Sequence, residues 1–205
     1  MATLNPSWRL LACTLLCVQS VAAAAPRVVT SLLELRQQHV IVQKFDLSCG
    51  AAALATLLRF QHGEPVTERD VATGLMRRSE YIDDPGLIRR REGFSLLDLK
   101  RYAQSRGYDG LGFGNLGLED LMRDAPLMVP VNLHGYNHFV IFRGSVNHRA
   151  VLADPAWGNR SMPLDEFLRA WIDFPQLGRI GFLIRRRDGQ PATDNLLALP
   201  PESAR

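Results

Sequence analysis

The order of its secondary-structure patterns predicts an α+β fold for this chain of 205 residues. Ala-rich and amphipathic stretches typical of helices occupy the first half, and short apolar stretches typical of strands dominate after residue 126. Helices followed by a run of strands are the pattern of an α+β domain, here N-terminal helices packed on a C-terminal antiparallel sheet. Beyond the N-terminal segment, no stretch reaches 18 apolar residues, so no transmembrane span is expected in the mature chain.

The N-terminus has the pattern of a secretory signal peptide. Arg9 precedes an apolar run from Leu10 to Val21, and alanines at 22–25 offer a cleavage site. We therefore expect a signal peptide over residues 1–24, one domain over residues 25–187, and a loose tail rich in proline and polar residues over 188–205. The signal predicts export.

Five helices are expected in the first half and four strands in the second. The helices are justified by apolar periodicity and by caps, such as Thr67 with Asp70 and Ser95 with Asp98. The polar stretch 79–93, interrupted by Pro85 and Gly86, is expected to be a loop. The expected helices cover 31–38, 49–61, 67–78, 95–106 and 118–123, the expected strands 127–133, 139–143, 150–153 and 180–185, and a further helix 164–171.

The cysteine count raises a question about Cys49. Cys13 and Cys17 leave with the signal peptide, so the mature chain keeps Cys49 alone and has no disulfide framework. Such a thiol is buried and inert, paired between chains, or reactive. A lone cysteine is more often a small buried hydrophobic residue, so the neighbouring residues must decide.

Two features of the sequence QKFDLSCG favour a reactive thiol. Cys49 begins an expected helix, where the helix dipole and the free N–H groups favour the thiolate. Gln43 lies six residues upstream, so its side-chain amide can turn back toward the sulfur. With the backbone N–H of Cys49, this amide would form an oxyanion hole for a tetrahedral intermediate.

His138 is the best candidate for the base that a thiol nucleophile requires. It begins the apolar strand sequence HFVIF, so a rigid element would hold its ring. A hairpin turning around residues 144–147 would bring Asp154, at the end of the next strand, beside His138. The carboxylate would then fix the tautomer of the imidazole.

Other kinds of site find no support in the sequence. The formal net charge of +3 is too small to indicate nucleic-acid binding. The acidic pairs at 83–84 and 119–120 have no histidine at ligand spacing, and the glycine-rich stretch 110–117 lacks the lysine of a phosphate-binding loop. No metal and no cofactor are therefore expected. Trp157 and Trp171 are interpreted most simply as core residues, with a role for Trp157 in the wall of the site beside Asp154 as the alternative.

The segments QKFDLSCGAAALATLL, NHFVIF and ADPAWG together resemble the double-glycine leader peptidases, which are bacteriocin-processing cysteine peptidases with a papain-like fold. The resemblance implies a papain-like fold in which Cys49 is the nucleophile and His138 the base. It also implies that Asp154 orients the base, that Gln43 donates to the oxyanion, and that cleavage follows a Gly-Gly pair. Ala51 stands where many members have proline.

The best-known members of that family are domains of membrane transporters, whereas this chain resembles a free-standing, exported version. Such versions are similar to the peptidase encoded with bacterial functional-amyloid export systems of the fimbrial kind. The resemblance implies a periplasmic location and peptide or protein substrates, including secreted amyloid subunits or other export-system components. Two alternatives stay open: a catalytically silent module that holds a substrate, and acyl transfer to an amine instead of water.

Overall fold

The architecture is described by a computed structural model that covers residues 30–199, so the expected signal peptide lies outside the described residues. Helices and a six-stranded antiparallel sheet confirm the α+β prediction. The helices are α1 (Leu32–Gln37), α2 (Cys49–His62), α3 (Glu68–Met76), α4 (Ser79–Asp83), α5 (Leu87–Arg90), α6 (Leu96–Ser105), α7 (Leu118–Asp124) and α8 (Leu164–Ala170).

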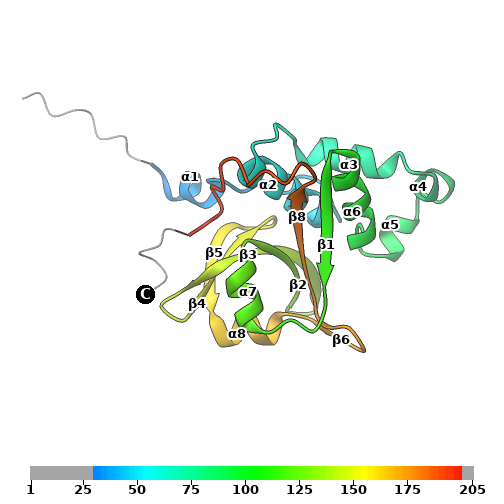
Figure 1. The fold of residues 1–205 in the computed structure, drawn as a ribbon. Helices are drawn as coiled ribbons and strands as arrows, with labels where there is room; N and C mark the ends of the chain where they lie inside the picture. Colours follow the sequence, from blue (N-terminus) through cyan, green and yellow to red (C-terminus); the bar gives the residue numbers. More distant parts are fainter. Residues whose placement is uncertain (1–29, 200–205) are drawn as a thin grey trace, which may run out of the picture.

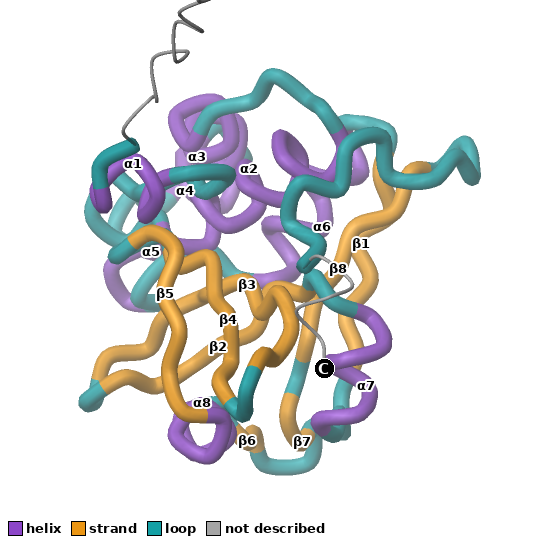
Figure 2. The backbone as a smooth tube through the Cα atoms, turned by 90° about the vertical axis from the view of Figure 1, so that its left-hand side faces the viewer, coloured by secondary structure: helices purple, strands orange, loops and turns teal. Residues whose placement is uncertain are grey.

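The large sheet has the strand order β1-β8-β2-β3-β4-β5, and β6 and β7 form a small second sheet. Helix α2 packs against β3, and α6 packs against β1. Helix α8 packs against β2, β4 and β5. Figures 1 and 2 show α2 to α6 gathered at one end of the molecule, above the curved sheet. The strands are β1 (Tyr108–Phe113), β2 (Leu127–Leu133), β3 (Tyr136–Val146), β4 (Arg149–Asp154), β5 (Gly158–Pro163), β6 (Asp173–Phe174), β7 (Gly178–Arg179) and β8 (Gly181–Arg186).

Helix α2 is the central helix of the fold and begins at Cys49. The alanine and leucine side chains from residue 51 to 58 are all buried. A helix that is buried on nearly all sides needs apolar residues on all of them, as this sequence has. Gly50 packs closely against the side chains of Leu99 and Phe139. A Cβ at this position would come within 3.2 Å of Leu99 and 3.4 Å of Phe139. The helix ends at Gly63, whose left-handed conformation (φ 73°) is the usual cap.

The caps predicted for α3 and α6 are present. Thr67 and Asp70 form a capping box at the start of α3, and Ser95 and Asp98 form one at the start of α6. Ser48 lies at the N-cap of α2 but makes no side-chain cap. The first amides of α2 therefore have no side-chain partner from the capping position.

The prediction of a loop over residues 79–93 is wrong, because α4 and α5 lie there. Tyr81 is buried at 1% exposure, and its hydroxyl donates to Asp98 at 2.7 Å. Arg78 and Arg91 each lie within about 4 Å of the same buried carboxylate. Contacts across the fold thus form these short helices, although the local composition is that of a loop.

The hairpin of β3 and β4 turns later than expected. Its two turn residues are Asn147 and His148, both with positive φ, and not the segment 144–147. Gly144 (φ 138°) instead follows a β-bulge at Arg143, where the pairing passes from Phe142 to Gly144. Four strands, β1 and β5 of the large sheet and β6 and β7 of the small one, have no counterpart in the sequence prediction.

The C-terminal segment also differs from expectation. Leu197 is fully buried, and the Leu196 amide donates to the Phe60 carbonyl at 2.8 Å, so the described part of the segment lies against α2 and is not loose. Trp171 is buried as expected. Trp157 is 61% exposed, so its interpretation as a core residue is wrong.

Candidate active site

Three of the four predicted site residues lie together at the end of the sheet that α2 covers. Cys49 is the first residue of α2, His138 lies near the start of β3, and Asp154 ends β4. All three are buried, at 4%, 4% and 0% exposure. They meet because α2 packs on β3 and β3 pairs with β4.

The bulge at Arg143 decides that His138 and Asp154 share a face of the sheet. Residues paired across strands lie on the same face, and faces alternate along each strand. On the His138 side of the bulge, the observed pairing of Phe142 with Leu152 puts even-numbered residues of both strands on one face. If Arg143 were instead paired in a regular ladder from the same turn, Phe142 would oppose Ala153, and His138 and Asp154 would lie on opposite faces.

His138 is held by a short hydrogen bond to Asp154. Nε2 of His138 lies 2.7 Å from Oδ1 of Asp154, which also accepts from the Ala156 amide at 2.8 Å. The other oxygen of Asp154 lies 3.5 Å from the Arg160 guanidinium. Nδ1 of His138 is buried and makes no hydrogen bond within the described residues, so it can exchange a proton with the neighbouring thiol.

The pKa values of Cys49 and His138 move in opposite directions. Burial would raise the pKa of the Cys49 thiol, but the neighbouring imidazole of His138, with the backbone amides of Phe139 and Gly50, lowers it. Burial would lower the pKa of His138, but its interactions with Asp154 and Cys49 raise it to about 9. Both shifts favour the pair of a thiolate and an imidazolium over the neutral pair.

Gln43 lies beside the same strand end. Its backbone N–H donates to the Pro155 carbonyl at 2.7 Å, next to Asp154. The side-chain amide donates to the Phe45 carbonyl at 3.4 Å, while Oε1 is buried and has no hydrogen-bond partner in the described part of the chain. Gln43 does not line the cleft over the thiol, so its contribution to an oxyanion hole stays a prediction.

A narrow cleft opens onto Cys49 and His138. Its volume is about 240 Å³, below the usual range of roughly 300–1,000 Å³ for small-molecule sites. One isoleucine and three phenylalanines are among the side chains that line it. The remaining lining residues are Arg91, Glu92, Gly93, Phe94, Ser95, Pro130, Asn137, Phe139, Ile172 and Phe174.

Sequence reasoning missed Glu68, a buried carboxylate that binds the loop before Cys49. It is the first residue of α3, directly after the Thr67 cap, where acidic residues are common for local reasons. No local pattern therefore distinguishes it from an ordinary helix-start residue.

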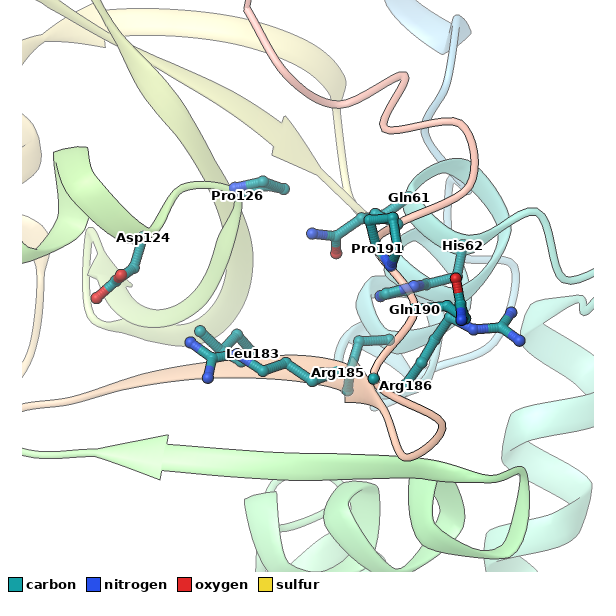
Figure 3. A pocket seen from close by; sticks show the side chains of 12 residues that line it. Gln61, His62, Asp124, Pro126, Leu183, Arg185, Arg186, Gln190 and Pro191 are labelled. Atoms are coloured by element: carbon teal, nitrogen blue, oxygen red, sulfur yellow. The ribbon is translucent and has the colours of Figure 1, made fainter.

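A second pocket, of about 320 Å³, lies at the far end of α2 (Figure 3). His62, Gln61 and Arg186 line it, but none of the four predicted site residues does. Burial, together with the charge of Arg186, lowers the pKa of His62, so its ring is neutral.

In residues 30–199, no group of three or more His, Cys, Asp or Glu is placed to hold a metal ion.

Among residues 30–199, no helix is both long enough and apolar enough to span a membrane.

Several known peptidases are similar to this chain. The model of the Peptidase C39 family matches residues 37–174. A probable functional amyloid protease, FapD, of Pseudomonas aeruginosa is 36% identical over 153 residues, and its namesake in Pseudomonas fluorescens is 38% identical. These matches cover 74% and 73% of this chain, but just under two thirds of the relatives, 66% and 65%.

A solved structure extends the likeness to the fold. It is a double glycine motif protease from an AMS/PCAT transporter in complex with the leader peptide, 26% identical with a TM-score of 0.56. The alignment covers 72% of this chain and 90% of that one. The family match and the two Pseudomonas relatives together establish that this chain belongs to the Peptidase C39 family.

Proposed function

We propose that the chain is an exported cysteine endopeptidase in which Cys49 is the nucleophile. The observation that carries the proposal is the line of three buried groups, a thiol at a helix start, an imidazole and a carboxylate. The opposite pKa directions of Cys49 and His138 support it, because they favour the reactive thiolate. The alternative is a catalytically silent module that holds a substrate. Such a module would not need these residues, yet all four predicted positions are occupied here.

The reaction follows from the positions of these groups. The thiolate of Cys49 attacks the scissile carbonyl, and the oxyanion accepts hydrogen bonds from the Cys49 amide and from Gln43. The imidazolium of His138 protonates the leaving amine as the C–N bond breaks. Water, deprotonated by His138, then attacks the thioester, and Cys49 leaves as thiolate while the acyl group leaves as acid. Asp154 keeps the ring in the productive tautomer throughout.

The narrow cleft supports a preference for small residues before the scissile bond, and a Gly-Gly pair is the substrate that we propose. The name of the Pseudomonas relatives, functional amyloid protease, supports substrates among amyloid subunits or other components of a secretion system. The signal pattern of residues 1–24 supports a periplasmic location. In this proposal the chain processes peptide or protein substrates during export.

The substrate proposal is tested with two matched peptides that differ only in a central Gly-Gly or Val-Val pair. The full chain is expressed with its N-terminal segment, purified, and incubated with each peptide, and products are identified by mass spectrometry. We expect cleavage after Gly-Gly and at least about 100-fold slower cleavage after Val-Val, because the narrow cleft would exclude a branched side chain beside the thiol.

Equal rates for the two peptides would contradict the size argument, and no cleavage of any peptide would contradict the peptidase proposal. Adding a small amine during the reaction separates the two fates of the acyl-enzyme. A free acid product indicates hydrolysis, as proposed, and an amide product indicates acyl transfer.

A further inference from the structure

The loop that joins Gln43 to Cys49 is bound to a single buried side chain, Glu68 of α3. Glu68 is 4% exposed. Its carboxylate accepts from the Lys44 amide at 3.0 and 2.9 Å, and from the Phe45 amide at 3.2 Å. It also accepts from the Ser48 hydroxyl at 2.5 Å. Both ends of the loop are therefore tied to one residue.

These contacts hold a conformation that the loop would not adopt alone. Leu47 lies in the left-handed region (φ 61°), which is unfavourable for a residue with a branched side chain. The single hydroxyl hydrogen of Ser48 is directed to Glu68 at 2.5 Å, with the Phe45 carbonyl 2.7 Å away, and the side chain makes no cap for α2. Backbone amides that donate to a carboxylate form stronger hydrogen bonds than neutral pairs, so Glu68 can offset this strain.

The contacts lie next to the two proposed oxyanion donors. Lys44 and Phe45 directly follow Gln43, and the side-chain amide of Gln43 donates to the Phe45 carbonyl. Ser48 directly precedes Cys49, whose backbone N–H is the second donor. Glu68 itself is not among the residues that line the cleft, and it makes no hydrogen bond to Cys49 or His138 in the described part of the chain.

We infer that Glu68 is a positioning residue that fixes the distance between the two oxyanion donors, Gln43 and the Cys49 amide. The inference rests on the proposed peptidase function and adds a residue that acts through the loop. Misplacement of a group by about 1 Å can cost about 100-fold in rate. Because Glu68 touches neither the thiol nor the imidazole, its loss should change turnover and leave the thiolate in place.

The test compares Glu68→Gln, Glu68→Asp and a control, Glu64→Gln. The control removes a carboxylate that binds Arg106 and Tyr108, away from the cleft. In Glu68→Gln we expect kcat to fall about 100-fold while KM changes by less than about threefold. Glu68→Asp keeps the charge and should lose less, about tenfold, and Glu64→Gln should keep its kcat.

A second readout separates positioning from unfolding. The pH dependence of Cys49 alkylation by iodoacetamide should be the same in Glu68→Gln as in the original chain. Unchanged kcat in the Gln variant, or an alkylation profile that shifts together with kcat, would overturn the inference. If the Gln variant does not fold, the Asp variant decides by the same two readouts. If the original chain neither cleaves peptides nor shows an activated thiol, the proposed function fails, and not the role of Glu68 alone.

Discussion

Replacing Cys49 with alanine is expected to abolish peptide cleavage while the domain stays folded. The variant removes the atom that attacks the carbonyl, and loss of a nucleophile costs about 10⁴-fold or more in kcat. The side chain that is lost is small and buried, so the free energy of unfolding should fall by only about 1 kcal/mol. Steady-state cleavage and urea unfolding measure the two quantities on the same sample.

Ser48→Ala is unsuitable as a control because Ser48 binds Glu68, whereas Ala55→Ser changes a buried position six residues along α2 from the thiol. Ala55→Ser should lose some stability and keep most of its turnover. Full activity in Cys49→Ala would remove Cys49 from the mechanism.

Changing Asp154 to asparagine is expected to lower kcat by about 100- to 10,000-fold, which is less than the loss in Cys49→Ala. The carboxylate accepts from Nε2 of His138 and helps to raise the pKa of the ring to about 9. An amide has no charge and can present its NH₂ group to the ring, so the imidazolium is less favoured and its tautomer less defined.

The pH dependence of kcat/KM distinguishes this role from a general loss of structure. In the original chain, activity should fall as pH rises through about 9, where His138 loses the proton that it gives to the leaving amine. In Asp154→Asn this fall should occur at lower pH. Asp188→Asn, which removes an exposed carboxylate paired with Arg186, is the matched control and should keep the original profile. An unchanged rate and profile in Asp154→Asn would remove Asp154 from the site.

The sequence allowed the elements around the site to be predicted because their signals are local. The capping boxes of Thr67 and Ser95 mark two helix starts, and the apolar composition from Cys49 to Gly63 marks a third. His138 and Asp154 could be paired because neighbouring strands of a hairpin lie side by side.

What the sequence could not predict depends on contacts between distant residues. The bulge at Arg143 sets the register that puts His138 and Asp154 on one face, yet Gly144 has the local signature of a turn. The burial of Tyr81 against Asp98 forms α4 in a polar stretch. Glu68 binds a loop more than twenty residues away in the sequence, and nothing near it indicates that contact.

The C-terminal segment is likewise ordered by contacts with distant residues that its composition does not predict. Its composition is that of a disordered tail, but Arg143 of β3 donates to the Leu197 carbonyl at 2.8 Å, and Leu197 fills a fully buried position. A single apolar residue and a few backbone hydrogen bonds are enough to bind a segment whose average composition predicts no structure.

The most direct test of the central claim, an activated Cys49 thiolate beside His138, is the rate of iodoacetamide alkylation at Cys49 across pH 4 to 9, followed by mass spectrometry. Thiolate is lost only as pH falls through the thiol pKa, so a lowered pKa predicts rapid alkylation well below pH 8. In His138→Ala the largest interaction that lowers the thiol pKa is gone and burial remains, so the rise in rate should move to higher pH. A thiol that reacts only near the ordinary cysteine pKa of about 8.5, with or without His138, would contradict the account.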